Sequence, residues 1–493
     1  MQTRDAIDSM PGSVAWAAAT KWFDVIASTT TFILLAALIG PQAWGLYGMV
    51  LVVTALPETI IGGPLAEVLI QQRDLRQGHI AAARVLHLAL AAIFAVLAMA
   101  AGPWIAAGFG HAEIGTLLPV FAATLLPLAA GAPSTALLQR KLRFRSIAVV
   151  DAAGTALATT VGISVALSGG GVWSLMWMEA TRRVVRAIAF LVAEGSPISF
   201  RFTWRDLRDL THFNLMTLGA QLLMKADATV PRLAVGAVLG PAALGYFNFA
   251  YRLYEQASAL VIAPFGAVAL PMIARLRDDR ERLHQAIRKI MKASAVAAYP
   301  AFIGAAAVAP IAIPLILGDT WKPAVSVVQL VLLLGVRSAT NAYTGAILRG
   351  CGRPELQTAN MAIGLVVTCC LVPFVAGLGV EAVAIAMLAR AMVVWIIGAL
   401  LAESASGYRA LSQIIVGWRS LVASLVMAGA VLTAINQLSG LPSGWLLPLA
   451  IGVGIVVYAL VLAALDQTAA REAASTLLRR IVRTPQRSGS GAR

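Results

Sequence analysis

The chain has few charged residues for its length. Only 12% of its 493 residues are charged, against about 25% in soluble domains, and 59% are hydrophobic. A mean hydropathy of +0.82 leaves no room for a large soluble domain. The apolar runs are continuous rather than alternating, which disfavours a transmembrane β-barrel. The composition therefore predicts an all-α polytopic membrane protein.

Motifs of catalysis and of metal binding are also missing. The sequence has no Walker A motif, no Gly-x-Ser-x-Gly and no His-Glu-x-x-His. Its three cysteines, Cys351, Cys369 and Cys370, show no metal-ligand spacing with the five histidines, so we interpret them as packing residues. We therefore expect a protein that is not an enzyme, with no catalytic residue, no cofactor and no metal site.

Fourteen apolar segments are each long enough to cross a bilayer core of about 30 Å. They lie near residues 15–39, 43–63, 79–101, 116–138, 146–167, 171–193, 212–239, 243–266, 291–317, 323–347, 357–377, 380–401, 418–438 and 444–465. The sequence therefore predicts about 14 transmembrane helices. The first residues lack a small-residue cleavage site, so we expect an uncleaved start and not a signal peptide.

Lysine and arginine are concentrated in alternate loops. Four cations lie in Arg140–Arg145 and the end of the chain from Arg471 is also basic, whereas the opposite loops carry one cation, Lys322. The positive-inside rule predicts that both termini are cytoplasmic. The loop cations account for much of the net charge of +15, and we expect them to bind anionic phospholipids of the inner leaflet. Nucleic-acid binding is disfavoured, since the cations are spread over many loops and no nucleic-acid-binding module is present.

Three short stretches of the first half recur, in the same order, in the second half. They are Leu38–Tyr47 with Val238–Phe247, Thr135–Arg140 with Thr344–Arg349, and Gly171–Leu175 with Gly379–Val383. The copies are 200, 209 and 208 residues apart, which indicates a duplicated unit of six spans. Six is even, so the halves are parallel repeats related by an axis along the membrane normal. Duplicated bundles of this kind are typical of transporters with a site between the halves.

The repeat also predicts how the chain is divided. The predicted parts are an N-terminal lobe at 1–193, a cytoplasmic linker at 194–210, a C-terminal lobe at 211–403, two additional helices within 404–465 and a basic cytoplasmic tail at 466–493. The last two spans have no counterpart in the repeat, so we interpret them as an addition to the duplicated bundle.

Ionisable residues within the spans are the main functional signal. A charge at the bilayer centre costs at least ~2.5 kcal/mol, so it usually faces a partner or a watery cavity. The cations that we assign to a substrate-binding cavity are Arg337, Arg390, Arg252, Lys225, Lys21, Arg182 and Arg186. The carboxylates that we assign as candidate ion-coupling sites are Asp24, Asp227, Glu179 and Glu255. The cation excess suits an anionic solute, because guanidinium and ammonium donors match phosphate oxygens.

Structural roles stay open for several of these residues. Lys21 is near a cytoplasmic span end and could extend to the interface. Arg252 and Glu255 are three residues apart on one helix face and could neutralise each other. The two aspartates could form structural ion pairs with the lysines near them in sequence. Arg337 and Arg390 have no acid within a turn and are the strongest cavity candidates.

Five segments carry a family resemblance. They are Ala136–Arg145, Leu239–Phe247 with Tyr251–Leu253, Pro271–Arg288, Leu317–Ala324 and Gly350–Leu356. In this order and spacing the chain resembles bacterial polysaccharide flippases of the multidrug/oligosaccharidyl-lipid/polysaccharide exporter superfamily. Its likeness is strongest to the oligosaccharide flippases of exopolysaccharide, capsule, O-antigen and teichuronic-acid pathways.

The resemblance implies two six-helix lobes that face each other in a V around a central cavity. It implies alternating access in the bacterial inner membrane, with a lipid-linked oligosaccharide on an undecaprenyl diphosphate carrier as the substrate. Cationic cavity residues would hold the pyrophosphate, and of the candidates only Arg252 lies in a matching segment. The polymerase and the chain-length or export proteins of the same pathway are the protein partners that it implies.

Two other functions were weighed against this one. A cation-coupled small-molecule or drug antiporter of the same superfamily would be expected to line its cavity with carboxylates and aromatic residues. The cation-rich spans disfavour that function.

A membrane polymerase or ligase acting on the same glycan would need a large outward loop with catalytic residues, and the predicted outward loops are short.

Overall fold

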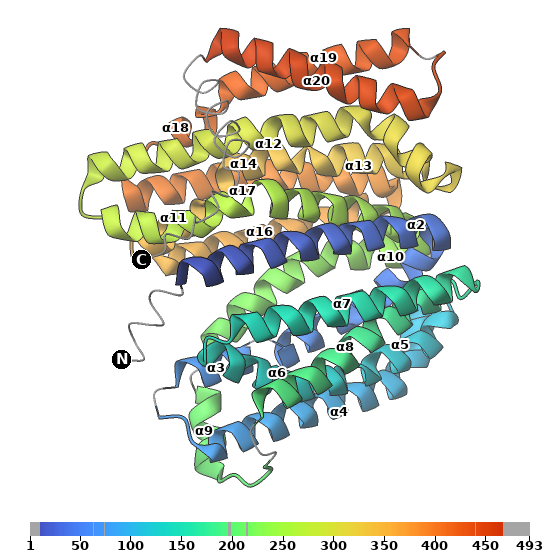
Figure 1. The fold of residues 1–493 in the computed structure, drawn as a ribbon, viewed down its shortest axis with the longest axis vertical. Helices are drawn as coiled ribbons and strands as arrows, with labels where there is room; N and C mark the ends of the chain where they lie inside the picture. The colour runs from blue at the N-terminus through green and yellow to red at the C-terminus, as the bar shows by residue number, and fades with distance from the viewer. Residues whose placement is uncertain are drawn as a thin grey trace, which may run out of the picture. The chain divides into compact units, whose positions relative to one another are not determined.

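The computed structural model describes residues 10–62, 64–72, 74–195, 199–212, 215–438 and 440–466. Figure 1 shows the chain as a succession of helices, and no strand occurs in these ranges. Two compact units are formed. The first comprises the chain up to Gln256 with Ile316–Leu330 and Thr358–Val394, and the second comprises Ala257–Leu315, Val331–Gln357 and the chain from Trp395 on. The predicted division into lobes, linker and tail stays a prediction.

The helices have the following bounds. In the first half they are α2 (Met10–Gly62), α3 (Pro64–Gln71), α4 (Gln77–Phe109), α5 (Glu113–Ala123), α6 (Leu125–Arg140), α7 (Phe144–Leu167), α8 (Val172–Glu194), α9 (Trp204–His212) and α10 (Leu215–Val261). They continue with α11 (Ala263–Leu276), α12 (Arg280–Leu317), η1 (Asp319–Trp321), α13 (Ala324–Leu332), α14 (Leu334–Asn341), α15 (Thr344–Gly350) and α16 (Pro354–Val375). The last are η2 (Ala376–Leu378), α17 (Val380–Ser406), α18 (Ala410–Ile415), α19 (Trp418–Gln437) and α20 (Ser443–Leu465).

Two of the long helices contain a sharp bend at the repeated Gly-Pro sequence. Gly40 in α2 has φ 75° and ψ 172°, and Gly240 in α10 has φ 83° and ψ −176°. Glycine adopts such positive φ values without the steric cost that a side chain brings, and the proline that follows cannot donate a backbone hydrogen bond. Each of these two helices therefore provides two spans.

Eleven helical stretches of the described residues are long and apolar enough to cross a membrane. Two of them, Ser28–Gln71 and Gln221–Val261, contain the glycine bends, and α8 adds a 23-residue helix that carries several charges. With these taken into account, each of the fourteen predicted segments corresponds to a helical stretch, and some of these stretches are interrupted, as between α5 and α6 and between α13, α14 and α15. The predicted all-α polytopic fold is confirmed, and the chain is a multi-pass membrane protein.

One helix begins three turns before the apolar span that was predicted within it. The span expected to begin at residue 291 belongs to α12, which begins at Arg280. The added turns are amphipathic, since Leu283, Ile287 and Met291 are buried at helical spacing while their neighbours are polar. A search for continuous apolar runs misses a helix segment of this kind.

The repeated Gly-Pro turns pack against each other within the first unit. A Cβ atom added to Gly45 would overlap the carbonyl oxygen of Pro241, and one added to Gly245 would overlap that of Pro41. Both contacts join a glycine to the proline of the other copy, so the arrangement is reciprocal. Only glycine at both positions lets the two backbones approach this closely.

Helix α8 is held between α6 and α7 by small residues. A Cβ added to Gly131 of α6 would lie 3.1 Å from Cα of Ala187, and one added to Gly162 of α7 would lie 3.0 Å from Cβ of Met178. Close packing of this kind fixes the rotation of α8 about its axis. It therefore determines which of the charges on α8 face the interior.

Candidate functional site

Two adjoining cavities lie within the first unit. The first cavity has a volume of about 380 Å³ and is lined by α2, α7, α8 and α10. The second cavity has a volume of about 590 Å³ and is lined by α2, α3, α6, α8 and α10. The residues that line both cavities are Glu58, Glu179, Arg182, Arg183 and Lys225. The junction between the cavities is therefore formed entirely by ionisable side chains.

A network of ion pairs holds the α8 side of this junction. Arg183 donates through Nε to Glu179 Oε1 at 2.6 Å and through Nη2 to Glu58 Oε1. Its guanidinium also lies 4.7 Å from the centre of the Phe121 ring, and its side chain is only 8% exposed. Arg182 pairs with the other oxygen of Glu179, but 41% of its side chain is exposed. Arg183 is therefore a buried structural cation, whereas Arg182 is accessible from the cavities.

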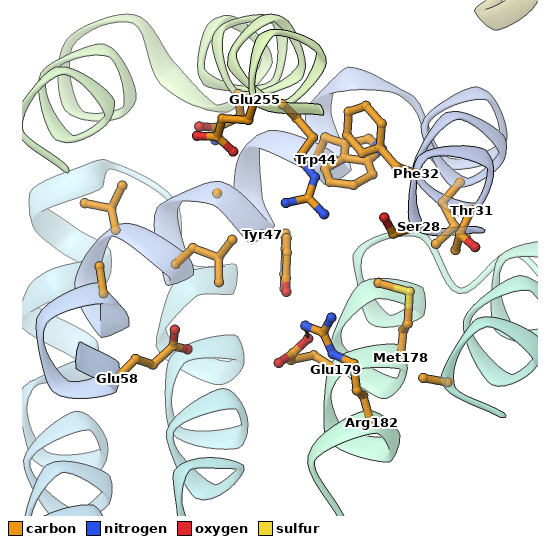
Figure 2. A pocket seen from close by; sticks show the side chains of 18 of the residues that line it. Ser28, Thr31, Phe32, Trp44, Tyr47, Glu58, Met178, Glu179, Arg182 and Glu255 are labelled. Carbon is orange, nitrogen blue, oxygen red and sulfur yellow. Dashed lines mark hydrogen bonds and ion pairs between the residues drawn. The ribbon is translucent and has the colours of Figure 1, made fainter. Parts of the chain in front are cut away.

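The α10 side of the first cavity carries further cations. Arg232 donates to Glu255 at 3.2 Å and to the amide oxygen of Asn248 at 3.1 Å. Lys225 and Arg252 also line the cavity, and neither has a carboxylate partner among the described residues. Among the described residues, the lining contains five cations and three carboxylates, which leaves two positive charges in excess. The lining thus brings together five of the predicted residues, Arg182, Lys225, Arg252, Glu179 and Glu255. Figure 2 labels Arg182, Glu179 and Glu255 among them.

Arg390 and Asp227 lie away from both cavities and are paired with each other. Thr368 completes the pair, because its hydroxyl donates to Asp227 Oδ1 at 2.7 Å and lies 3.1 Å from Nε of Arg390. Only 12% of the Arg390 side chain is exposed. The acid that the sequence around Arg390 lacks is supplied by another helix, α10. Asp227 is thus ion-paired, but with Arg390 and not with Lys225, the nearby lysine that the sequence suggested as its partner.

The other assigned residues are dispersed. Arg186 lines the second cavity and pairs with Asp151 of α7 at 3.0 Å. Arg337 is in α14 of the second unit and lines neither cavity. Lys21 and Asp24 fall in the part of α2 whose side chains lie outside the described residues. The substrate-binding and ion-coupling roles of all these residues stay predictions.

Three charged residues in the described lining of the first cavity were given no role from the sequence. They are Glu58, Arg183 and Arg232, and each carried the same signal as the assigned ones, a charge within a predicted span. The sequence could not show that Glu58 meets Arg183, since 125 residues separate them. The uncharged wall of the first cavity, which includes Phe32 and Trp44, carried no signal at all because aromatic residues are common in spans.

The chain was compared with known proteins. The sequence profile of the family described as "Polysaccharide biosynthesis protein" matches residues 34–326, more than half of the chain. The succinoglycan biosynthesis transport protein ExoT of Rhizobium meliloti is 24% identical over 322 residues, which are 65% of each chain. The lipopolysaccharide biosynthesis protein WzxC of Escherichia coli is 20% identical over 334 residues, which are 66% of each chain.

The comparison with solved structures concerns the fold. A lipid II flippase, MurJ, in an inward closed conformation superposes with a TM-score of 0.73 at 13% identity, covering 95% of this chain and all of that one. The chain spans just under two thirds of the length of the two curated relatives named above. The extent of the profile match shows that this chain belongs to the polysaccharide biosynthesis protein family.

Proposed function

We propose that this protein is a flippase that moves oligosaccharide repeat units linked to undecaprenyl diphosphate across the bacterial inner membrane. It acts as a transporter and not as an enzyme, and serves the assembly of an exopolysaccharide, capsule or O-antigen. Membership of the family supports the proposal, as do the printed names of the relatives and the shared fold with a lipid II flippase. The distribution of loop cations supports a cytoplasmic location for both termini.

The observation that carries this proposal is the charge of the first cavity. The described part of its lining has two cations in excess, and within it Lys225 and Arg252 lack a carboxylate partner. A pyrophosphate that links a lipid to a sugar carries about two negative charges near neutral pH, with oxygens that accept charge-assisted hydrogen bonds. The substrate's charge thus matches the excess on the lining. Arg182, paired but 41% exposed, adds a third donor at the junction.

The order of the cavities gives a direction of entry. Gln139 lines the second cavity and directly precedes the basic loop Arg140–Arg145, which the positive-inside rule places in the cytoplasm. Trp44 lines the first cavity and follows the Gly-Pro turn on the opposite side. The headgroup therefore enters through the second cavity and reaches the first. Alternating access then exposes it to the periplasmic side.

The described lining of the first cavity offers little to a cationic solute. Each of the three carboxylates of the first cavity is paired with an arginine: Glu58 with Arg183, Glu179 with Arg182 and Arg183, and Glu255 with Arg232. An exporter of cationic drugs needs carboxylates that are free to bind its solute. The paired carboxylates therefore favour the flippase over the antiporter.

Flipping by the purified protein tests this proposal. Full-length protein is reconstituted in vesicles with lipid-linked repeat units extracted from the host, and a glycosidase added outside reports how many glycans reach the outer leaflet. We expect the wild type to accelerate flipping. The double variant Lys225→Gln/Arg252→Gln should flip the lipid at least about tenfold more slowly than the wild type, because hydrogen bonds to charged groups contribute about 1.5–3 kcal/mol each.

A lysine outside the cavities provides the matched control. Lys322 is 61% exposed and pairs with Asp319, so Lys322→Gln removes one positive charge without changing either cavity. It should flip at the wild-type rate. Wild-type flipping by the double variant would refute the pyrophosphate site, and a wild type that flips no glycan would refute the proposed function.

A further inference from the structure

The first cavity has two chemically different walls. One wall holds the ionisable residues of α8, α10 and the second part of α2. The other wall is formed by α7, by α2 before its glycine bend and by Trp44 just after the bend. Its further residues are uncharged: Ser28, Thr31, Phe32, Leu35, Thr155, Ala158 and Thr159. Figure 2 shows Ser28, Thr31, Phe32 and Trp44 on one side of the space and Glu58, Glu179 and Arg182 on another, with Tyr47 between them.

Trp44 is held in place by aromatic neighbours. Its ring packs edge to face against the rings of Phe32 and Tyr47, with centroid distances of 5.0 and 6.4 Å. The ring of Phe32 in turn stacks on that of Phe249, with the centroids 5.1 Å apart. Such contacts fix the orientation of a ring. A lining residue that is fixed before a ligand arrives loses little conformational entropy on binding. Trp44 is therefore preorganised.

The indole nitrogen of Trp44 has no acceptor. Its Nε1 atom is buried and makes no hydrogen bond with the described residues. Trp321, which belongs to the same aromatic cluster through Phe249, instead donates its Nε1 hydrogen to the carbonyl oxygen of Ala36 at 3.1 Å. A buried donor without an acceptor is unfavourable. Of these two indoles, only that of Trp44 therefore has a donor that no described residue uses and that a ligand oxygen would satisfy.

Hydroxyl groups surround the aromatic wall. Oγ1 of Thr31 lies 3.1 Å from Oγ1 of Thr159, which joins α2 to α7 at the cavity surface. A pyranose ring has an apolar face of C–H groups and a rim of hydroxyls. An aromatic ring, an N–H donor and neutral hydroxyls match both parts, whereas a charged wall would have to be desolvated.

We propose that this wall is a sugar-binding subsite and that Trp44 is its main contact. The inference rests on the proposed function, because the pyrophosphate at Lys225 and Arg252 places the first sugars of the repeat unit in the same cavity. A volume of about 380 Å³ lies at the lower end of the range of small-molecule pockets, about 300–1,000 Å³. The subsite therefore holds the reducing end of the glycan and not the whole repeat unit.

Binding of two lipids that differ only in the glycan tests this inference. The probes are undecaprenyl diphosphate and the same carrier with the host's repeat unit, each titrated into the full-length protein in nanodiscs. Trp44→Leu should raise the Kd of the glycan-bearing lipid about tenfold, the loss of one aromatic contact and one hydrogen bond. It should leave the Kd of the bare carrier within about twofold. Trp44→Phe keeps an aromatic ring but loses the donor, so its Kd for the glycan-bearing lipid should lie between those of the wild type and Trp44→Leu.

Two further variants separate recognition from folding. Trp104 is a tryptophan of α4 that is 73% exposed and lines neither cavity, so Trp104→Leu should change neither Kd. Thr31→Val keeps the shape of the side chain and should weaken only the glycan-bearing lipid, which keeps the test usable if Trp44→Leu does not fold.

The outcomes distinguish this inference from the proposed function. Equal losses for both lipids in Trp44→Phe and Thr31→Val, or no loss for either, would overturn the sugar subsite while the flippase function stands. A wild-type protein that binds neither lipid would overturn the function itself, and the subsite with it.

Discussion

Arg182 and Arg390 are 208 residues apart, the same interval that separates the repeated sequences at Gly171 and Gly379. They occupy the same place in α8 and α17, the last helix of each predicted lobe. Arg182 pairs with an acid of its own helix and is 41% exposed next to both cavities. Arg390 pairs with an acid of α10 and is 12% exposed. Both arginines have the same position in their helix, so the neighbouring helix decides whether the charge is accessible or structural.

The largest expected effect is on stability, at Arg390. Arg390→Ala leaves the Asp227 carboxylate in the protein interior without its cation, which typically costs about 3–5 kcal/mol. We expect a marked fall of the unfolding temperature in detergent and of the amount of protein in the membrane. The double variant Arg390→Ala/Asp227→Ala should recover part of this loss, since it removes both charges.

The opposite outcome at Arg390 would reverse the comparison. A variant Arg390→Ala that unfolds like the wild type but no longer flips lipid would show that Arg390 binds substrate, as its sequence alone suggested. The pair would then belong to the transport site and not to the supporting structure.

The next effect is expected where the two halves are alike, at the Gly-Pro turns. Gly45→Ala and Gly245→Ala each place a methyl group on a proline carbonyl of the other copy, and overpacking of this kind typically costs about 1–3 kcal/mol. Because the contact is reciprocal, we expect losses of similar size, measured as the change in unfolding temperature.

A glycine in open space is the control for these two variants. Gly429 in α19 has no atom within 4 Å of an added Cβ, so Gly429→Ala should not lower the unfolding temperature. Unequal results at Gly45 and Gly245, with one of them tolerated, would show that the contact is not symmetric in the protein's working states.

Arg182 should affect transport more than stability. Arg182→Ala leaves Glu179 paired with Arg183, so the unfolding free energy should fall by no more than about 1 kcal/mol. The flipping rate should fall at least about tenfold if Arg182 donates to the pyrophosphate, a loss of about 1.4 kcal/mol. Parallel measurement of melting and of vesicle flipping separates the two effects. A stable variant with full activity would remove Arg182 from the site.

The smallest effect concerns a carboxylate outside the membrane spans. The hydroxyl and backbone N–H of Thr203 donate to Asp206 at 2.7 and 2.8 Å and hold the pKa of Asp206 below its usual range. The charged form is therefore favoured by the folded state. Its stabilisation is present above the usual pKa of about 3.9 and is lost as the pH falls through the lowered pKa.

Hydrogen exchange of α9 measures this effect. Protection of α9 should decline as the pH falls below the usual aspartate pKa. In Thr203→Val this decline should be smaller and should end at a higher pH, because the folded-state pKa of Asp206 rises toward its usual value. An unchanged pH profile in Thr203→Val would show that these hydrogen bonds do not hold the start of α9. Unlike the two arginines, Asp206 lies outside the predicted membrane spans.

Much of the fold could be predicted because it depends on local composition. Continuous apolar runs gave the spans, and the Gly-Pro pairs gave the bends at Gly40 and Gly240. The amphipathic start of α12 was missed, since its apolar residues Leu283 and Ile287 are separated by polar ones. Local sequence thus determines the helices but not all of their limits.

The site was harder to predict because it depends on the rotation and pairing of helices. Arg182 and Arg183 are adjacent, and residues next to each other on a helix point about 100° apart. Packing of α8 against α6 and α7 decides that Arg183 is buried against Glu58 while Arg182 is accessible. Likewise, nothing near Arg390 in the sequence indicates its partner, which lies 163 residues away.

The central claim is that this protein moves a lipid-linked glycan to the periplasmic leaflet, and one measurement tests it most directly. In the host with the gene deleted, undecaprenyl-linked repeat units are extracted after treatment of whole cells with a glycosidase that reaches only the periplasmic side. We predict that these intermediates accumulate and stay protected from the enzyme, and that the restored gene makes them sensitive again. Intermediates that are normal in amount and fully sensitive in a deletion strain without a second flippase would contradict the account.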